Sequence, residues 1–266
     1  MNETTPRTVV LTGAAGRIGG HLRRVDGGLG GRGWRLRLLD AGPIDDAAGG
    51  EEPFVADVGV EESTEVLVEA MTGADAVVHL AGIASEDVWT RLRRTNVDGT
   101  YRVLEAARRA GVRRVVLASS NHAVGFYPSH EVARTDQTVR PDSFYGVSKA
   151  AVEALGSLYA DRYGLEVVSL RIGLCAERPR STFDLGIWLS PADAVRLVDA
   201  ALSGPVEGHV IAFGVSANSR GWWDLSSALA LGYEPRDDAE TFAQDVEEYA
   251  GPQLLGNGMT RKEPTP

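Results

Sequence analysis

Short apolar runs alternate with longer segments of helical periodicity along most of the chain. The runs have the length of buried strands and occupy residues 8–12, 34–39, 53–56, 76–80, 114–119, 166–171 and 209–213. The longer segments at 18–25, 88–110, 143–163 and 191–202 predict helices. Strands that alternate with helices indicate an α/β fold with a doubly wound parallel sheet, in which ligands bind beyond the carboxyl ends of the strands.

Three glycines separate the first predicted strand from the first predicted helix. Gly13, Gly16 and Gly19 follow the strand directly, with Arg17 and Ile18 between the last two. The first glycine allows a tight turn, the second lets phosphates approach the backbone, and the third lets the helix pack on the strand. Free amides and the positive end of the helix dipole attract a pyrophosphate. We therefore predict a Rossmann-type nucleotide site here, with an ordinary turn as the alternative.

Two acidic residues end strands next to this turn. Asp40 ends the second strand, where a carboxylate binds the adenosine ribose 2′-hydroxyl and repels a 2′-phosphate. Because Ala41 and Gly42 follow it instead of a basic residue, we expect the cofactor to be NAD and not NADP. Asp57 follows the third strand and either meets the adenine edge or is a solvated acid.

A candidate catalytic group follows in the second half of the chain. Tyr145 and Lys149 are one helical turn apart, so they share a helix face, and Ser120 follows the fifth strand. The lysine ammonium, together with the positive nicotinamide ring, favours the tyrosinate and should lower the tyrosine pKa, so that Tyr145 acts as a general base. Ser120 can stabilise the reacting oxygen. Asn121 and His122 come next and should contact hydroxyls of the substrate, although His122 could instead make a structural hydrogen bond.

Composition narrows the function further. The 266 residues carry a net charge of -10, which argues against a nucleic-acid partner. Cys175 is the single cysteine, so neither an intramolecular disulfide nor a multi-cysteine metal site is expected, and we predict no bound metal. With no long apolar stretch we expect no membrane segment and a cytoplasmic location. We expect one Rossmann-type domain over residues 1–266, with the substrate-binding elements mainly in a small C-terminal portion, 174–266.

The motifs resemble those of the extended short-chain dehydrogenase/reductases, also called the NAD-dependent epimerase/dehydratase family. The resemblance covers nearly the whole chain and rests on the three glycines, both strand-end aspartates, Leu80-Ala81-Gly82, Asn96, Ser120 and the Tyr145–Lys149 pair. It implies a homo-oligomer and contacts to NAD from Val58, Leu80, Ala81, Gly82, Lys149 and Cys175.

Within that family the chain is most similar to the uronate dehydrogenases. The similarity lies in Ala118 to His122, Arg171 to Gly173, Trp188 to Ser190 and Gly221 to Asp224. It implies NAD-dependent oxidation of a uronate, such as glucuronate or galacturonate, at C1 to an aldonolactone.

Three substrate positions depart from the uronate dehydrogenase pattern. Ala84 and Leu174 stand where that group has serines, and Phe183 stands where it has the arginine that meets the substrate carboxylate. Arg180 or Arg178 could replace that arginine. These departures leave the type of reaction unchanged and leave the identity of the sugar open.

Other functions remain open at this point. The part of the chain after Lys149 is short, which favours a free monosaccharide or its acid over a nucleotide sugar. A dehydrogenase of another free aldose or of a sugar phosphate is the main alternative. A sugar epimerase, which would show no net NADH, and a cofactor-binding regulator without turnover are the others.

Overall fold

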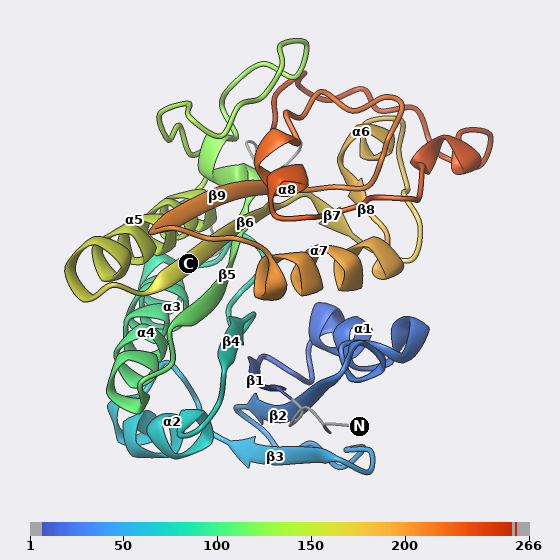
Figure 1. Ribbon diagram of the computed structural model, residues 1–266. Helices are drawn as coiled ribbons and strands as arrows, with labels where there is room; N and C mark the ends of the chain where they lie inside the picture. The colour runs from blue at the N-terminus through green and yellow to red at the C-terminus, as the bar shows by residue number, and fades with distance from the viewer. Residues whose placement is uncertain (1–6, 257–258, 260–266) are drawn as a thin grey trace.

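The computed structural model describes residues 7–256 and residue 259. Its centre is a seven-stranded, wholly parallel sheet with the strand order β3-β2-β1-β4-β5-β6-β9 (Figure 1). The strands are β1 Arg7–Thr12, β2 Trp34–Asp40, β3 Glu51–Val55, β4 Ala76–His79, β5 Arg114–Ser120, β6 Glu166–Ile172 and β9 His209–Gly214. The order reverses between β1 and β4, which opens a crevice at their carboxyl ends.

Helices cover both faces of this sheet (Figure 1). On one face α1 (Arg17–Arg24) packs against α7 (Pro191–Ser203), and their apolar side chains share a core with Val9 and Leu11 of β1. The other face is covered by α2 (Thr64–Met71), α4 (Gly99–Ala110) and α5 (Phe144–Tyr163). The predicted doubly wound fold is confirmed, because strands buried on both faces alternate with helices.

Smaller elements gather beyond the carboxyl ends of the strands. A two-stranded parallel sheet joins β7 (Leu174–Cys175) to β8 (Trp188–Leu189), and α6 (Asp184–Ile187) lies between them in sequence. The short helix α8 (Ser226–Ala230) contacts β9. In the described part of the chain, no helix has the length and apolarity needed to cross a membrane.

The predicted elements agree with the structure except in detail. The fourth strand ends at His79, one residue earlier than expected. The helix predicted over 88–110 consists of α3 (Trp89–Leu92), a π-helical segment over Arg93–Asp98 and α4. The prediction missed α2, whose eight residues include two valines and a threonine that lower helix propensity. It also missed the two-residue strands β7 and β8, which have too few residues to show a period.

Candidate active site

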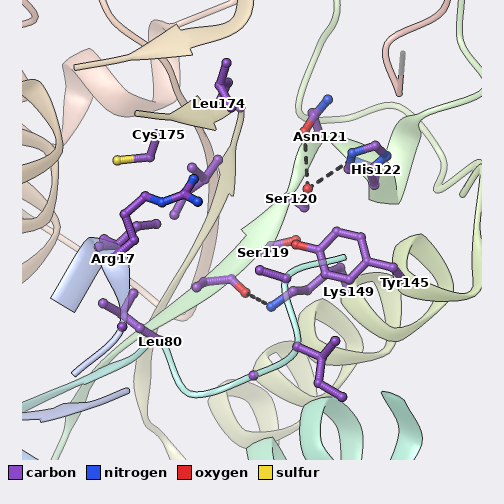
Figure 2. A pocket seen from close by; sticks show the side chains of 18 of the residues that line it. Arg17, Leu80, Ser119, Ser120, Asn121, His122, Tyr145, Lys149, Leu174 and Cys175 are labelled. Carbon is purple, nitrogen blue, oxygen red and sulfur yellow. Dashed lines mark hydrogen bonds between the residues drawn. The ribbon is translucent and has the colours of Figure 1, made fainter. Parts of the chain in front are cut away.

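A cavity of about 640 Å³ lies where the strands end, within the usual size of small-molecule sites. The predicted site residues that line it are Gly13, Gly16, Arg17, Ile18, Gly19, Leu80, Gly82, Ala84, Ser120, Asn121, His122, Tyr145, Lys149, Leu174 and Cys175. In Figure 2, Ser120, Tyr145 and Lys149 lie together on one side, and Arg17 and Cys175 face them from the other. Segments far apart in the sequence therefore form one site.

The glycine turn has little room for larger residues. Gly13 has φ +71°, and a Cβ there would lie 2.6 Å from the Ala81 amide nitrogen. A Cβ on Gly19 would lie 2.4 Å from the Gly13 carbonyl oxygen. Among the described residues, no side chain caps the N-terminus of α1, and its first turn holds no acidic residue. This geometry fits the phosphates of a dinucleotide, since amides and helix dipole are available to an anion.

Asp40 is fixed beside the glycine turn without lining the cavity. Its carboxylate accepts hydrogen bonds from the amides of Ala15, at 3.0 Å, and Ala41, at 2.8 Å. The carboxylate thus ties the end of β2 to the turn. Asp57 also lies outside the cavity lining, and it accepts from the Gly59 amide and pairs with Arg94 at 2.8 Å.

Two further predicted cofactor residues occupy structural positions. Val58 is buried, and a Cβ on Gly99 would lie 2.9 Å from one of its methyl groups. The Ala81 amide donates to the Thr12 hydroxyl at 3.3 Å. Both positions lie near the predicted nucleotide site, but neither side chain lines the cavity, so their contact with a cofactor stays a prediction.

The tyrosine and the lysine lie together in a buried environment. Tyr145 is 6% exposed, and the Lys149 ammonium lies 5.7 Å from the centre of its ring. Burial raises the pKa of Tyr145 to about 12, and a hydrogen bond with Ser120 acts in the opposite direction. The sequence led us to expect a lowered tyrosine pKa, but burial outweighs the other effects in this structure. Burial also lowers the pKa of Lys149 to about 8, and its ammonium donates to the Ala118 carbonyl oxygen at 2.7 Å.

Ser120, Asn121 and His122 form the adjoining wall. The Ser120 hydroxyl donates to the Asn121 side-chain oxygen at 3.2 Å, and the Asn121 amide group donates to the Leu255 carbonyl at 2.6 Å. His122 Nδ1 lies 2.9 Å from Asp142 Oδ2, and its ring packs edge-on against Tyr145 (Figure 2). His122 therefore lines the cavity and also makes a structural hydrogen bond.

The start of α5 is held from several directions, which fixes Tyr145. The Ser143 hydroxyl accepts from the Gly146 amide at 2.9 Å, as an N-cap does. Glu86, on the loop after β4, accepts from the amides of Phe144 and Tyr145 at 3.1 and 2.8 Å. These bonds satisfy helix amides that would otherwise lack partners.

Asn96 connects the same loop to α5 from the π-helical segment. Its side chain exchanges two hydrogen bonds with the backbone of Ile83, at 2.8 and 3.0 Å, and donates to the Ser148 hydroxyl at 2.9 Å. A polar residue that is 1% exposed and fully bonded positions its neighbours. Asn96 thus holds the loop that carries Ala84 against the helix that carries Tyr145.

The wall across from α5 is largely apolar. Leu174 and Cys175 of β7 line it together with Ile187 of α6, and burial raises the pKa of the Cys175 thiol to about 12. Phe183 is 5% exposed and packs against Trp222. Asp184 is the acidic residue of this wall.

The two candidate arginines lie outside the cavity lining. Arg178 is exposed, pairs with Asp245 at 3.2 Å and lies over the ring of Phe242. Arg180 is also exposed, and its backbone amide donates to Asp184. The structure therefore does not bring either guanidinium to the cavity wall, and a contact with the substrate stays a prediction.

Several lining residues were not predicted from the sequence. They are Ile83, Ala118, Ser119, Ile172, Gly173, Asp184, Ile187, Gly256 and Met259. Most belong to loops or strand ends whose position depends on the fold. Asp184 had a local signal, because Ser181 precedes it by three residues in a Ser-x-x-Asp pattern typical of a capping box.

Known proteins are similar to this chain in both sequence and architecture. The uronate dehydrogenase of Pseudomonas putida is 42% identical over 253 residues, which cover 95% of this chain and 92% of the relative. The NAD-dependent glucose-6-phosphate dehydrogenase of Haloferax volcanii is 37% identical, with coverage of 90% and 97%. A crystal structure of a uronate dehydrogenase mutant from Agrobacterium tumefaciens, complexed with NAD, superimposes with a TM-score of 0.88 at 35% identity, covering 97% of this chain and 98% of that one.

A family model locates the similarity on the nucleotide-binding half. It matches residues 9–176, which run from β1 to just beyond β7 and include the glycine turn, Ser120, Tyr145 and Lys149. The family model and the relatives thus agree with the fold. The chain belongs to the NAD-dependent epimerase/dehydratase family.

Proposed function

We propose that this protein oxidises a free sugar acid, a uronate such as glucuronate or galacturonate, at C1 to an aldonolactone with NAD. The observation that carries the proposal is the meeting of Ser120, Tyr145 and Lys149 at a cavity that also contains the glycine turn. The similarity to the Pseudomonas putida uronate dehydrogenase supports the choice of a uronate. The wall near β7 and α6 would receive the part of the sugar remote from C1.

The residues that would hold NAD are the glycine turn and Asp40. The amides at the start of α1 face the phosphates, and the Asp40 carboxylate accepts a hydrogen bond from the adenosine ribose. Small residues at Ala81 and Gly82 leave room for the cofactor above the end of β4. When bound, NAD would accept a hydride from C1 of the sugar.

The protein's own residues carry the proton. Ser120 donates a hydrogen bond to the C1 oxygen, where negative charge develops. Tyr145, as the phenolate, takes the hydroxyl proton from that oxygen and becomes the neutral phenol, and the Lys149 ammonium beside it stabilises the phenolate form that acts as the base. The buried setting keeps the charge of Lys149 effective, because few water molecules screen it.

The proposal is tested by an assay of purified protein with NAD and a panel of sugars. The panel pairs glucuronate with glucose and galacturonate with galactose, since each pair differs only at C6. We expect NADH absorbance to rise with the uronates and an aldonolactone to form. Absence of NADH with every sugar, together with interconversion of sugar epimers, would instead support an epimerase.

Oxidation of a neutral aldose or a sugar phosphate is the second candidate. The observation in its favour is the far wall, where Phe183 is buried and Asp184 is acidic. A carboxylate or phosphate prefers a bidentate guanidinium. For a uronate, we propose that Arg180 turns toward the acid group, since its guanidinium is exposed. Equal kcat/KM for glucose and glucuronate would favour the neutral aldose.

The cofactor preference gives a separate prediction. We expect the wild type to prefer NAD over NADP strongly, and Asp40→Asn to narrow that preference by about tenfold, which corresponds to about 1.4 kcal/mol. Asparagine has one acceptor oxygen, so it can keep the bond from only one of the Ala15 and Ala41 amides, which bind different oxygens of Asp40, while the charge that repels a 2′-phosphate disappears. The measurement is kcat/KM for both cofactors. Equal values in the wild type would contradict the assignment of Asp40.

We also propose a homo-oligomer. Apolar side chains on α4 and α5 remain exposed, among them Tyr101, Leu158 and Tyr163. Such side chains on neighbouring helices suit a contact between copies of the chain. Light scattering of the purified protein measures the mass directly.

A further inference from the structure

Asp184 has one carboxylate oxygen that its own loop fixes in place. Asp184 Oδ2 accepts from the backbone amides of Arg180, at 3.0 Å, and Ser181, at 3.1 Å. In return, the Asp184 amide donates to the Ser181 hydroxyl at 3.3 Å. These reciprocal bonds close the turn before α6 and hold the side chain in one orientation.

The second oxygen, Oδ1, is available to a ligand. Within residues 7–256 and residue 259 the structure gives no hydrogen bond or ion pair to this oxygen, and the oxygen is not fully buried, so it is open to the cavity although the residue as a whole is only 8% exposed. Asp184 lines the same cavity as Ser120 and Tyr145. A buried carboxylate in an apolar setting needs donors for its remaining lone pairs, and a bound sugar carries several hydroxyl donors.

The charge around Asp184 is uncompensated. Its neighbours Phe183, Leu185 and Ile187 are apolar and buried, and no described cation forms an ion pair with it. The cations that line the described cavity are Arg17, at the start of α1, and Lys149, bound to the Ala118 carbonyl. An unpaired carboxylate attracts a hydroxyl donor and repels a second carboxylate.

We propose that Asp184 accepts a hydrogen bond from a substrate hydroxyl and thereby sets the selectivity between neutral and acidic sugars. Relative to a neutral residue at this position, the carboxylate favours a hydroxymethyl group over an acid group and so limits the preference of the site for uronates. This inference rests on the proposed sugar oxidation at C1. It adds a specificity determinant that belongs to none of the predicted substrate residues.

The test is Asp184→Asn, which retains an acceptor for the Arg180 and Ser181 amides and replaces the free anionic oxygen with a neutral donor. For glucose and galactose we expect kcat/KM to fall about ten- to a hundredfold, the range for losing a hydrogen bond to a charged group. The ratio of kcat/KM for glucuronate to that for glucose should rise at least about tenfold. An unchanged ratio would overturn the proposal.

Asp238→Asn is the matched control. Asp238 Oδ1 likewise accepts from two backbone amides, those of Ser219 at 3.1 Å and Glu240 at 2.9 Å, but it does not line the described cavity. This variant should leave the ratio unchanged. If Asp184→Asn fails to fold, Asp184→Ser removes the charge with a smaller side chain and is judged by the same ratio.

A second readout separates this inference from the proposed function. If none of the tested sugars leads the wild type to reduce NAD, the proposed oxidation of a sugar at C1 is wrong. The thermal stabilisation of the NAD-loaded protein by glucuronate and by glucose is then compared in wild type and Asp184→Asn. If glucuronate raises the Tm more, relative to glucose, in Asp184→Asn than in the wild type, Asp184 is supported as the determinant. If the two sugars raise the Tm of both proteins equally, the role of Asp184 is refuted.

Discussion

Tyr145→Phe should lower kcat by about 10²–10⁴-fold, the usual contribution of a positioned general base. Phenylalanine keeps the ring that packs against His122 and removes the phenol oxygen proposed to take the substrate proton. The affinity for NAD should change little, because the glycine turn and Asp40 are untouched. The expected loss is therefore confined to the chemical step.

Tyr159→Phe provides a control on the same helix. Tyr159 is also buried, but its hydroxyl donates to Glu105, and it does not line the described cavity. Its kcat should stay close to that of the wild type. Retention of more than about a tenth of kcat in Tyr145→Phe would rule out Tyr145 as the base.

The pH dependence has a definite sign. Burial raises the pKa of Tyr145 to about 12, so the phenol is protonated at neutral pH in the free protein. The base must be ionised to act, so sugar oxidation should speed up as the pH rises from neutral until the Lys149 ammonium, with its pKa of about 8, loses the charge that supports the phenolate. Tyr145→Phe should lose this dependence in its residual activity. The profile of kcat/KM against pH measures both.

The structure brings together at one cavity the residues that short local patterns singled out. The glycine turn, the Tyr145–Lys149 spacing and the strand-end serine each belong to one short segment, and the parallel sheet brings those segments to one edge. The strands were also recognisable, because burial on both faces gives continuous apolar runs. The turn, the spacing, the serine and the strands could be recognised because each depends only on residues that are close together in the sequence.

The far wall of the cavity could not be predicted in this way. Its residues come from β7, α6 and the C-terminal segment, and their approach depends on long-range contacts such as that between Asn121 and the Leu255 carbonyl. The burial of Tyr145 could not be predicted for the same reason. The sequence displays the neighbouring Lys149, but the burial that dominates appears only when the whole chain is folded.

A buried network of charged side chains joins α5 to the neighbouring strands β5 and β6. Arg171 of β6 and Glu153 of α5 form two hydrogen bonds, both of 2.9 Å, and their side chains are 1% and 5% exposed. The Ser119 hydroxyl donates to the same carboxylate at 2.6 Å. Glu153 is one helical turn from Lys149, so the network ties the catalytic helix to the strand that ends in Ser120.

Arg171→Met should destabilise the protein by about 3–5 kcal/mol, because it leaves the Glu153 carboxylate buried without its partner. The free energy of unfolding from urea titrations measures the loss. Arg113→Met is the control: Arg113 pairs with Glu166 at 3.0 Å, but its side chain is 76% exposed, so little change is expected.

The double variant Arg171→Met, Glu153→Gln shows whether an unpaired charge causes the loss. Removing both charges should recover part of the stability, since a neutral amide costs less to bury than a carboxylate. If Arg171→Met is as stable as the wild type, solvent or another group already stabilises the charge of Glu153. If the double variant is less stable than Arg171→Met, the Ser119 hydroxyl is the main partner of Glu153. The change Glu153→Gln would then weaken this 2.6 Å hydrogen bond.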